Sequence, residues 1–359
     1  MLHTPLPTLP RVRSFISDIF SYFRAAKVSK IMKNVAVIAG GNSAEYEVSI
    51  KSGNHVYETL DGQRFNKFLV IIKGVEWHVV EGERRYPVDK NDFSFSREGT
   101  KIKFDFAYIT IHGTPGENGL LQGYLDMLRV PHGCSVLCSA LTFDKYTCNN
   151  YLRGHGVNVP DSLLLRQGIA YDKEQVIREL GLPCFVKPNA DGSSFGISKV
   201  KSIDELDAAV ARAREYCPDV LVEQFIDGRE FTCGVARGGE AEWRLPVAEV
   251  ISKKEFFDFE AKYDPAFSEE IIPARVPEEF SRRIQTLSSL IYDLLRCEGI
   301  VRVDYRAKGD ELFMLEVNTT PGMTSNSFIP KMVTAANGNL REIFTAIIEN
   351  QCRSSLPRG

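Results

Sequence analysis

The sequence predicts an α/β (α+β) protein, in which an N-terminal unit with a parallel sheet precedes a larger region with antiparallel strands. Strand and helix patterns alternate over residues 32–130, which is typical of a parallel sheet with helices on its faces. Residues 300–307 and 311–318 indicate two strands, and the turn residues Lys308-Gly309-Asp310 between them indicate an antiparallel hairpin.

Composition and charge exclude several classes of protein. The chain has 359 residues, of which 43% are hydrophobic and 25% charged, enough for two or three domains with substantial cores. The formal net charge of −3 provides no attraction to nucleic acid or an anionic membrane, and no apolar run has the length of a membrane span. The eight cysteines are scattered without a C-x-x-C pair, which favours buried thiols in a reducing cytoplasm over a disulfide framework or zinc site.

The N-terminal unit begins with an apolar strand at residues 34–39 that runs into Gly40-Gly41, and a helical stretch follows to about Leu60. Further elements are expected in order: a strand at 65–73, helical or irregular segments, a strand at 104–111 and a helix at 118–128. Residues 1–31 stand apart. Part of this segment could form a short amphipathic helix, but it lacks the apolar core of a signal peptide, and we expect an extension.

Two further units follow. The second is expected to contain helices ending near residues 153 and 216 and strands at 162–166, 184–187, 197–200 and 220–224. The third is expected to contain strands at 229–236 and 245–251, a helix at 278–296 and the hairpin. Residues 252–275 are charged and aromatic without a clear period, which indicates a functional lid or a disordered loop. The expected division is an extension (1–31), an N-terminal α/β domain (32–135), a central subdomain (136–226), a C-terminal subdomain (227–352) and a tail (353–359).

The hairpin carries a candidate metal site. Side chains alternate between the two faces of a strand, so Val301, Val303 and Tyr305 share a face, as do Phe313, Leu315 and Val317. If both apolar sets face the core, the opposite face presents Arg302, Asp304, Glu316 and Asn318. Two carboxylates and an amide are hard oxygen ligands suited to magnesium, and without a cation the like charges would repel. The alternative is a solvated polar face.

Two other segments contain groups suited to a nucleotide. Lys187 ends a strand beside the Gly/Ser-rich residues 188–196, where an ammonium group, backbone N–H groups and hydroxyls could hold phosphates; the alternative is a simple turn. This loop joins two strands and is not a P-loop. Glu223 and Glu230 could accept hydrogen bonds from an adenine amino group or a ribose hydroxyl, or could be charges at a strand edge.

Two loops that follow N-terminal strands contain candidate substrate ligands. Glu45 follows Gly40-Gly41, and it either binds a substrate ammonium group or satisfies the dipole of the helix that begins there. His112 begins the segment HGTPGENG, as either a ligand or an anchor of the loop.

Eight segments occur in a specific order: GGNSAEYEVS from Gly40, HGTPGENG from His112, FDK from Phe143, VKPNADGSSFG from Val186, VEQFIDGREFT from Val222, FEAKYDPAF from Phe259, VRVD from Val301 and LEVNTTPGMTSNS from Leu315. Together they resemble the D-alanine–D-alanine ligases of the ATP-grasp superfamily, over about residues 33–350. The resemblance implies an ATP-grasp fold behind an N-terminal α/β domain. Gln224 departs from the family, many of whose members have a lysine there.

The resemblance also implies a role for each matching residue. ATP would be bound through its phosphates by Lys145 and Lys187, through adenine by Glu223, Phe225 and Ile226, and through ribose by Glu230. Two Mg²⁺ ions, for which Mn²⁺ could substitute, would be held by Asp304, Glu316 and Asn318. Arg302 and the Gly322 amide would stabilise oxyanion charge, and the two D-alanines would meet Glu45, His112, Ser327 and Phe328. Lys262 and Tyr263 would lie on the lid, with Tyr263 bonded to Ser193 and Glu45.

The implied activity is ATP-dependent ligation of two D-alanines through an acyl phosphate, for peptidoglycan precursor synthesis. It would be carried out by a cytoplasmic homodimer whose partners are small molecules, not nucleic acid or membrane. A D-alanine–D-lactate ligase is an alternative, but such enzymes lack the lid tyrosine that Tyr263 matches. A non-catalytic ATP-binding protein and an ATP-grasp ligase for other substrates are further alternatives.

Overall fold

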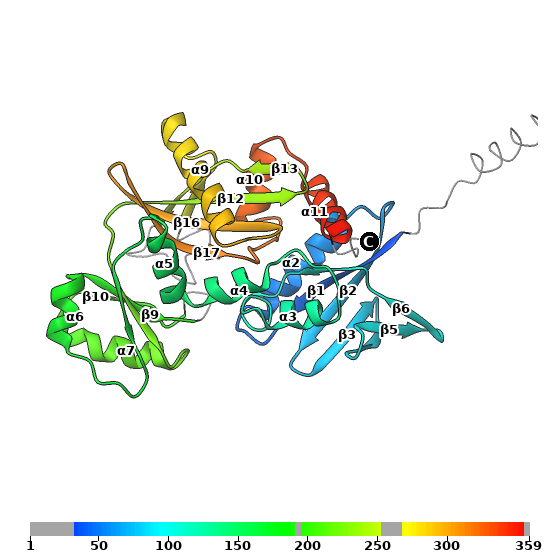
Figure 1. Cartoon of the computed structure of the whole chain (residues 1–359), viewed down its shortest axis with the longest axis horizontal. Helices are drawn as coiled ribbons and strands as arrows, with labels where there is room; N and C mark the ends of the chain where they lie inside the picture. Colours follow the sequence, from blue (N-terminus) through cyan, green and yellow to red (C-terminus); the bar gives the residue numbers. More distant parts are fainter. Residues whose placement is uncertain (1–31, 191–194, 253–267, 355–359) are drawn as a thin grey trace, which may run out of the picture.

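The computed structural model describes residues 32–190, 195–252 and 268–354. Within these residues the strands form three β-sheets, and Figure 1 shows them along an elongated molecule. The N-terminal sheet (blue to cyan) lies at one end, the central sheet (green) at the other, and the C-terminal sheet (orange) lies across both. None of the described helices is both long enough and apolar enough to cross a membrane.

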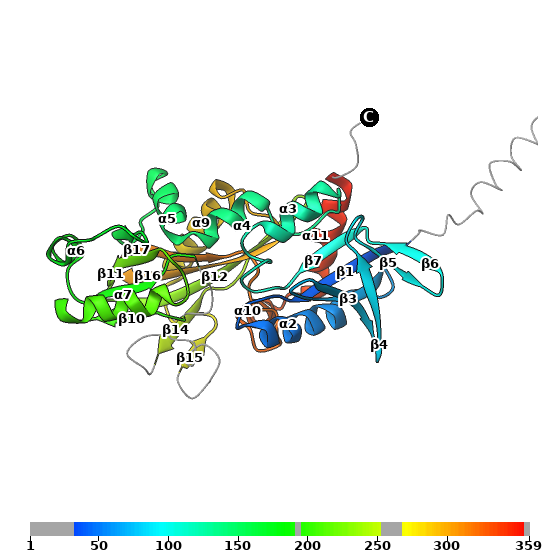
Figure 2. The same cartoon turned by 90° about the horizontal axis from the view of Figure 1, so that it is seen from below.

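The N-terminal sheet is mixed, with the strand order β6-β5-β4-β3-β2-β1-β7. Its parallel part is formed by β1 (Lys33–Gly40), β2 (Phe65–Lys73) and β7 (Phe106–Ile109), as the alternating pattern predicts. Helices α2 (Tyr46–Thr59) and α3 (Leu120–Met127) lie on opposite faces (Figure 2). Val35 and Val37 pack in the core that contains α2, whereas Ala36 and Ile38 pack in the core that contains α3. β1 is therefore covered on both sides.

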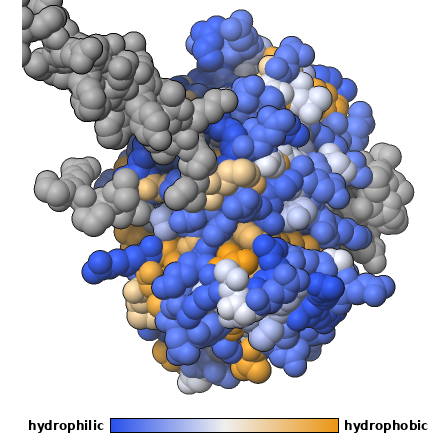
Figure 3. Space-filling model, turned by 90° about the vertical axis from the view of Figure 1, so that its right-hand side faces the viewer, coloured by the Kyte–Doolittle hydropathy of each residue, from blue (hydrophilic) through white to orange (hydrophobic). Residues whose placement is uncertain are grey.

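The prediction of helical or irregular structure between β2 and β7 was wrong. This segment forms four antiparallel strands: β3 (Glu76–Glu81), β4 (Arg84–Asp89), β5 (Ser94–Arg97) and β6 (Thr100–Lys103). Gly82 and Gly99 occupy the connections with φ of 60° and 78°, values that glycine adopts without strain. These tight turns are the signal that the sequence interpretation missed. Viewed from this end, the described surface is mostly hydrophilic, with hydrophobic residues in small groups (Figure 3).

The central sheet is antiparallel, with the order β10-β9-β11-β8. Its strands are β8 (Ser162–Leu165), β9 (Cys184–Pro188), β10 (Ser198–Val200) and β11 (Val220–Gln224), close to the predicted ranges. Its helices are α6 (Lys173–Leu180) and α7 (Leu206–Arg214), and the connecting helices α4 (Val136–Phe143) and α5 (Lys145–Gly154) precede it. The prediction missed α6, which begins after Asp172, whose side chain accepts a hydrogen bond from the Gln175 N–H.

The C-terminal sheet has the order β15-β14-β12-β16-β17, with β13 paired to β12. Its strands are β12 (Arg229–Gly238), β13 (Ala241–Arg244), β14 (Ala248–Ser252), β15 (Ser268–Ile271), β16 (Ile300–Lys308) and β17 (Glu311–Asn318). The helices of this part are α9 (Glu278–Leu294), α10 (Phe328–Ala335) and α11 (Leu340–Ser354). Most of the predicted lid, residues 253–267, lies outside the described residues.

A bulge in β17 corrects the predicted faces of the hairpin. Asp304 pairs with Glu316 but Tyr305 pairs with Met314, so that Leu315 is an extra residue. The insertion reverses the alternation, and the core therefore receives Leu312, Met314 and Val317 instead of Phe313, Leu315 and Val317. Leu315 points to the opposite face and lines a pocket together with the neighbouring Glu316.

The N-terminal and C-terminal parts share a hydrophobic core. Val35, Phe106 and Tyr108 of the N-terminal sheet pack in one cluster with buried residues of α11. The rings of Tyr108 and Phe344 meet edge to face, with centroids 5.0 Å apart. Figure 1 shows α11 (red) beside the start of the N-terminal sheet. The N-terminal sheet and helix α11 are thereby held against each other.

Candidate active site

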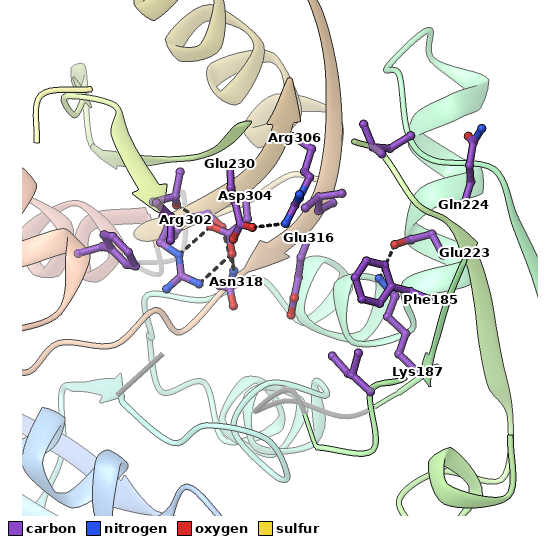
Figure 4. Close-up of a pocket in the computed structure, with 16 residues that line it drawn as sticks. Phe185, Lys187, Glu223, Gln224, Glu230, Arg302, Asp304, Arg306, Glu316 and Asn318 are labelled. Carbon is purple, nitrogen blue, oxygen red and sulfur yellow. Dashed lines mark hydrogen bonds and ion pairs between the residues drawn. The ribbon is translucent and has the colours of Figure 1, made fainter. Parts of the chain in front are cut away.

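A pocket lies between the central and C-terminal sheets (Figure 4). The central sheet and the segment after it contribute Phe185, Lys187, Ile197, Glu223, Gln224 and Ile226. The C-terminal part contributes Glu230, Thr232, Val250, Arg302, Asp304, Arg306, Leu315, Glu316, Asn318 and Phe328. On the side of the central sheet, Phe185, Ile197 and Ile226 alternate with polar or charged residues, and the side of β16 and β17 is mainly charged. Apolar surface beside charged groups suits a ligand with a base and phosphates.

Lys187 and Glu223 form an ion pair within this pocket. Lys187 Nζ donates to Glu223 Oε2 at 2.8 Å, and the two side chains are only 12% and 5% exposed. The strands that carry them, β9 and β11, are neighbours in the central sheet. Asn149 of α5 also donates to Oε1 of Glu223, at 3.4 Å. Two predicted ATP ligands are thus held together with little access to water.

Asp304 is the centre of a hydrogen-bonded group on β16. Arg302 donates to both of its carboxylate oxygens at 2.9 Å, and Asn318 Nδ2 donates to Oδ2 at 2.9 Å. The hydroxyl of Thr232, which faces Asp304 across the strand pair, donates to Oδ1. The positive charge of Arg302 therefore compensates the negative charge of Asp304. Without Arg302, the charges of Asp304 and Glu316 would repel each other.

The predicted metal ligands are brought together. Asp304 and Glu316 are direct partners across β16 and β17. Asn318, two residues after Glu316, pairs with Arg302. All three side chains are half-buried and line the same pocket. Two carboxylates and an amide oxygen at adjacent positions fit a hard divalent cation such as Mg²⁺.

Glu230 lies on β12 beside this group. Its Oε2 accepts a hydrogen bond from Arg306 at 2.9 Å. Burial raises the pKa of Glu230, and the Arg306 guanidinium opposes that rise. Of the two residues expected beside adenine, Ile226 lines the pocket, while the Phe225 ring packs against that of Phe185 with centroids 5.7 Å apart.

Lys145 occupies the start of α5, next to the end of β9. Its N–H donates to the backbone carbonyl of Asn189 at 3.1 Å, and the Asn189 side chain accepts from the N–H of Tyr146 at 2.9 Å. Asn189 is buried and follows β9 directly. It therefore places the start of α5 beside the strand that carries Lys187.

Of the predicted substrate residues, Phe328 lines this pocket, whereas Glu45, His112 and Ser327 do not. Glu45 is buried immediately before α2, and its loop contacts that of His112 through a hydrogen bond from the Ser43 hydroxyl to the His112 carbonyl at 2.7 Å. Ser327 precedes α10, and its hydroxyl lies 2.8 Å from that of Thr324. Phe328 lines the pocket, with the Arg302 guanidinium 5.6 Å from the centre of its ring. Ser193, Lys262 and Tyr263 lie outside the described residues.

The sequence interpretation missed several residues of the site. Arg306 lies two positions after Asp304, so strand alternation could have placed it on the same face. Thr232 is found only through the pairing of β12 with β16, because 72 positions separate it from Asp304. No local pattern marks that pairing.

Two antiparallel sheets that close on a pocket, with a lysine on one and carboxylates on the other, define a protein of the ATP-grasp class. Residues 34–135 match the family model described as the D-Ala D-Ala ligase N-terminus, and residues 152–349 match the model described as the D-Ala D-Ala ligase C-terminus. The chain belongs to the D-alanine–D-alanine ligase family.

Individual relatives agree with this assignment. The D-alanine–D-alanine ligase of Phocaeicola vulgatus is 49% identical over 323 residues, which cover 89% of this chain and 99% of the relative. Among solved structures, the D-alanine–D-alanine ligase of Bacillus anthracis complexed with ATP has a TM-score of 0.73 at 31% identity, covering 91% of this chain and 99% of that one. The D-Ala:D-Ser ligase VanG of Enterococcus faecalis has a TM-score of 0.78 at 33% identity, covering 89% and 99%.

Proposed function

We propose that this chain is a ligase that joins two D-alanines, with conversion of ATP to ADP and phosphate, and so supplies peptidoglycan precursor synthesis. The observation that carries the proposal is that Lys187 lines the same pocket as Asp304, Glu316 and Asn318. A carboxylate is a poor acyl donor, and its activation by ATP requires cationic groups and metal ligands around one phosphoryl group.

The nucleotide would lie between the two sheets. Lys145 and Lys187 would neutralise phosphate charge, and Glu230 would accept a hydrogen bond from the ribose. Glu223 would accept from the adenine amino group through an oxygen lone pair that its ion pair with Lys187 does not use. Phe225 and Ile226 would flank the base. The apolar residues Phe185, Ile197 and Ile226, which line the pocket on the side of the central sheet, support this orientation.

Asp304, Glu316 and Asn318 would hold two Mg²⁺ ions, for which Mn²⁺ could substitute. When bound, these ions would screen the negative charge of the phosphates from the attacking carboxylate. Arg302 would hold the Asp304 carboxylate in place through its two hydrogen bonds.

The reaction would proceed in two displacements. An oxygen of the first D-alanine's carboxylate would bond to the γ-phosphorus while the bond to the β-phosphate oxygen breaks, giving an acyl phosphate and ADP. The deprotonated amine of the second D-alanine would then attack the acyl carbon, and phosphate would leave with the electron pair. Arg302 and the Gly322 amide would stabilise the intervening oxyanion.

The remaining residues would hold the substrates and exclude water. Glu45 would bind the ammonium group of the first D-alanine, with His112 beside it, and Ser327 and the Phe328 amide would receive the carboxylate of the second. Lys262 and Tyr263 would close over the site, with Tyr263 bonded to Ser193 and Glu45. Closure protects the acyl phosphate from hydrolysis.

The proposed second substrate is a D-alanine. The likeness to a D-Ala:D-Ser ligase shows that this fold accommodates more than one acceptor. We keep D-alanine because the motifs of this sequence resemble those of D-alanine–D-alanine ligases and Tyr263 matches the lid tyrosine of that family. D-lactate and a non-catalytic role are the alternatives. We also propose a cytoplasmic homodimer and the domain division at residues 135, 226 and 352.

The test is phosphate release from ATP and Mg²⁺ with a panel of D- and L-amino acids, D-serine and D-lactate, together with mass detection of the product. We expect release with D-alanine alone and formation of D-alanyl-D-alanine. A reaction with chelator in excess is the control. Release that is independent of D-alanine, or a larger response to another acceptor, would reject the proposed substrate.

A further inference from the structure

The loop that contains Gly322 connects β17 to α10 in the C-terminal part, yet groups from the N-terminal domain bond to it on both sides. On the side toward β17, the Thr320 hydroxyl lies 2.8 Å from Oε1 of Glu117 and 3.1 Å from the carbonyl oxygen of Ile111. The other carboxylate oxygen of Glu117 accepts from the N–H of Gly113 at 2.7 Å. Glu117 thus joins this loop to the loop of His112.

On the side toward α10, two residues of α2 hold the backbone of Met323. The hydroxyl of Ser52 accepts from the Met323 N–H at 3.2 Å, and His55 Nδ1 lies 2.6 Å from the Met323 carbonyl oxygen. A carbonyl oxygen only accepts, so Nδ1 of His55 must carry a proton. Helix α2 therefore holds both the N–H group and the carbonyl group of Met323.

These contacts are buried and rigidly supported. Thr320 and Met323 are almost fully buried, as is Ser52. Helix α2 packs directly on the sheet, because a Cβ at Gly53 would come within 2.6 Å of the Ala39 Cβ. Hydrogen bonds in such surroundings are costly to break, since water does not replace the lost partner.

Only Pro321 and Gly322 separate the two points of attachment. The two attachments therefore restrict displacement of the Gly322 amide. A preorganised donor is effective in catalysis when its position does not relax as charge develops, and an error of about 1 Å can reduce a rate by about 10²-fold.

We propose that Glu117, Thr320, Ser52 and His55 are positioning residues that fix the Gly322 amide for the ligation step. This inference rests on the proposed function, in which that amide stabilises the oxyanion. The N-terminal domain then does more than bind the first substrate: it also sets the geometry of a catalytic group carried by the C-terminal part. Ser327, five residues further along the same loop, would be set in the same way.

The test removes one hydroxyl from this arrangement. Thr320→Val keeps the side-chain volume but removes the hydroxyl that donates to Glu117. Thr320→Ser retains that hydroxyl. We expect kcat to fall by about 10- to 100-fold in the valine variant, with KM for ATP unchanged and recovery in the serine variant. Thr345→Val is the matched control, because its buried hydroxyl bonds to the Arg341 carbonyl at 2.8 Å within α11.

A second measurement does not depend on activity. Hydrogen–deuterium exchange of a peptide spanning residues 319–327 should be faster in Thr320→Val than in wild type and Thr345→Val. A phosphinate analogue of the tetrahedral intermediate should bind more weakly to Thr320→Val, in proportion to the loss of kcat. A structural role alone would lower the melting temperature without changing the ratio of analogue affinity to ATP affinity.

The outcomes separate the two proposals. Unchanged exchange in residues 319–327, or wild-type kcat in Thr320→Val, would overturn the positioning role. A second outcome is faster exchange in Thr320→Val together with a wild-type protein that does not ligate D-alanine. This result would support the attachment of the loop but would reject the proposed function. The role of the attachment in catalysis would then be rejected as well.

Discussion

Nζ of Lys187 lies 2.8 Å from Oε2 of Glu223, across two neighbouring strands of the central sheet. Both side chains are buried, so each charge depends on the other. The residues expected to bind opposite ends of ATP are thus part of one electrostatic unit. Its structural and functional contributions can be separated by experiment.

Removing one partner should destabilise the protein more than removing both. We expect Glu223→Leu to lose about 3–5 kcal/mol in the free energy of unfolding, because Lys187 is left buried without a counter-charge. The double variant Lys187→Met/Glu223→Leu should recover much of that loss yet bind ATP poorly. Urea unfolding and calorimetric ATP titration measure the two effects. ATP binding at wild-type strength in the double variant would contradict the assigned roles.

Glu316→Gln should abolish metal-dependent turnover without unfolding the protein. The change keeps the shape of the side chain but removes the negative charge opposite Asp304, which we propose binds the metal. We expect phosphate release to fall by about 10²-fold or more, since a metal contributes several kcal/mol to charge stabilisation. Glu311→Gln, the same change at the exposed end of β17, is the control. Normal turnover by Glu316→Gln would remove it from the metal site.

Gly322→Ala should impair binding of the second substrate. A Cβ at this position would lie 2.9 Å from the Ser327 hydroxyl, so either Ser327 or the loop must shift. We expect a higher KM for the second D-alanine and a lower kcat, with KM for ATP unchanged. Gly123→Ala is the matched control, because its Cβ would meet nothing within 4 Å. Equal kinetics for the two variants would show that the Gly322 contact is unimportant.

Glu298→Gln should stabilise the protein at neutral pH. Burial raises the pKa of Glu298 above its ordinary 4.5, Asp126 adds to the rise, and His132 opposes it. The folded state therefore holds this proton more tightly than the unfolded state does. Wild type should lose stability as the pH rises from 4.5 through the raised pKa.

The glutamine variant should lack this loss. Its melting temperature should exceed that of wild type above the raised pKa, and the two curves should converge below pH 4.5. A difference that is the same at every pH would indicate a packing effect instead of titration.

Elements bounded by clear local signals were predicted well. β2 and β11 have the predicted ranges, and the hairpin agrees to within one residue, because each is a short apolar run between turn residues. The strands β3 to β6 were missed because they are short and largely polar, so their alternation is weak. The bulge at Leu315 depends on pairing with β16 and leaves no local signal.

The order of motifs along the chain was sufficient to determine the family and the kinds of chemical group in the site, because those follow from residue identity and local spacing. Tertiary structure alone decided which groups meet. The bond between Glu117 and Thr320 joins residues 203 positions apart, and that between Ser52 and Met323 joins residues 271 positions apart. Such contacts arise when separate domains pack around a shared core, and no local periodicity encodes how that packing aligns two distant loops.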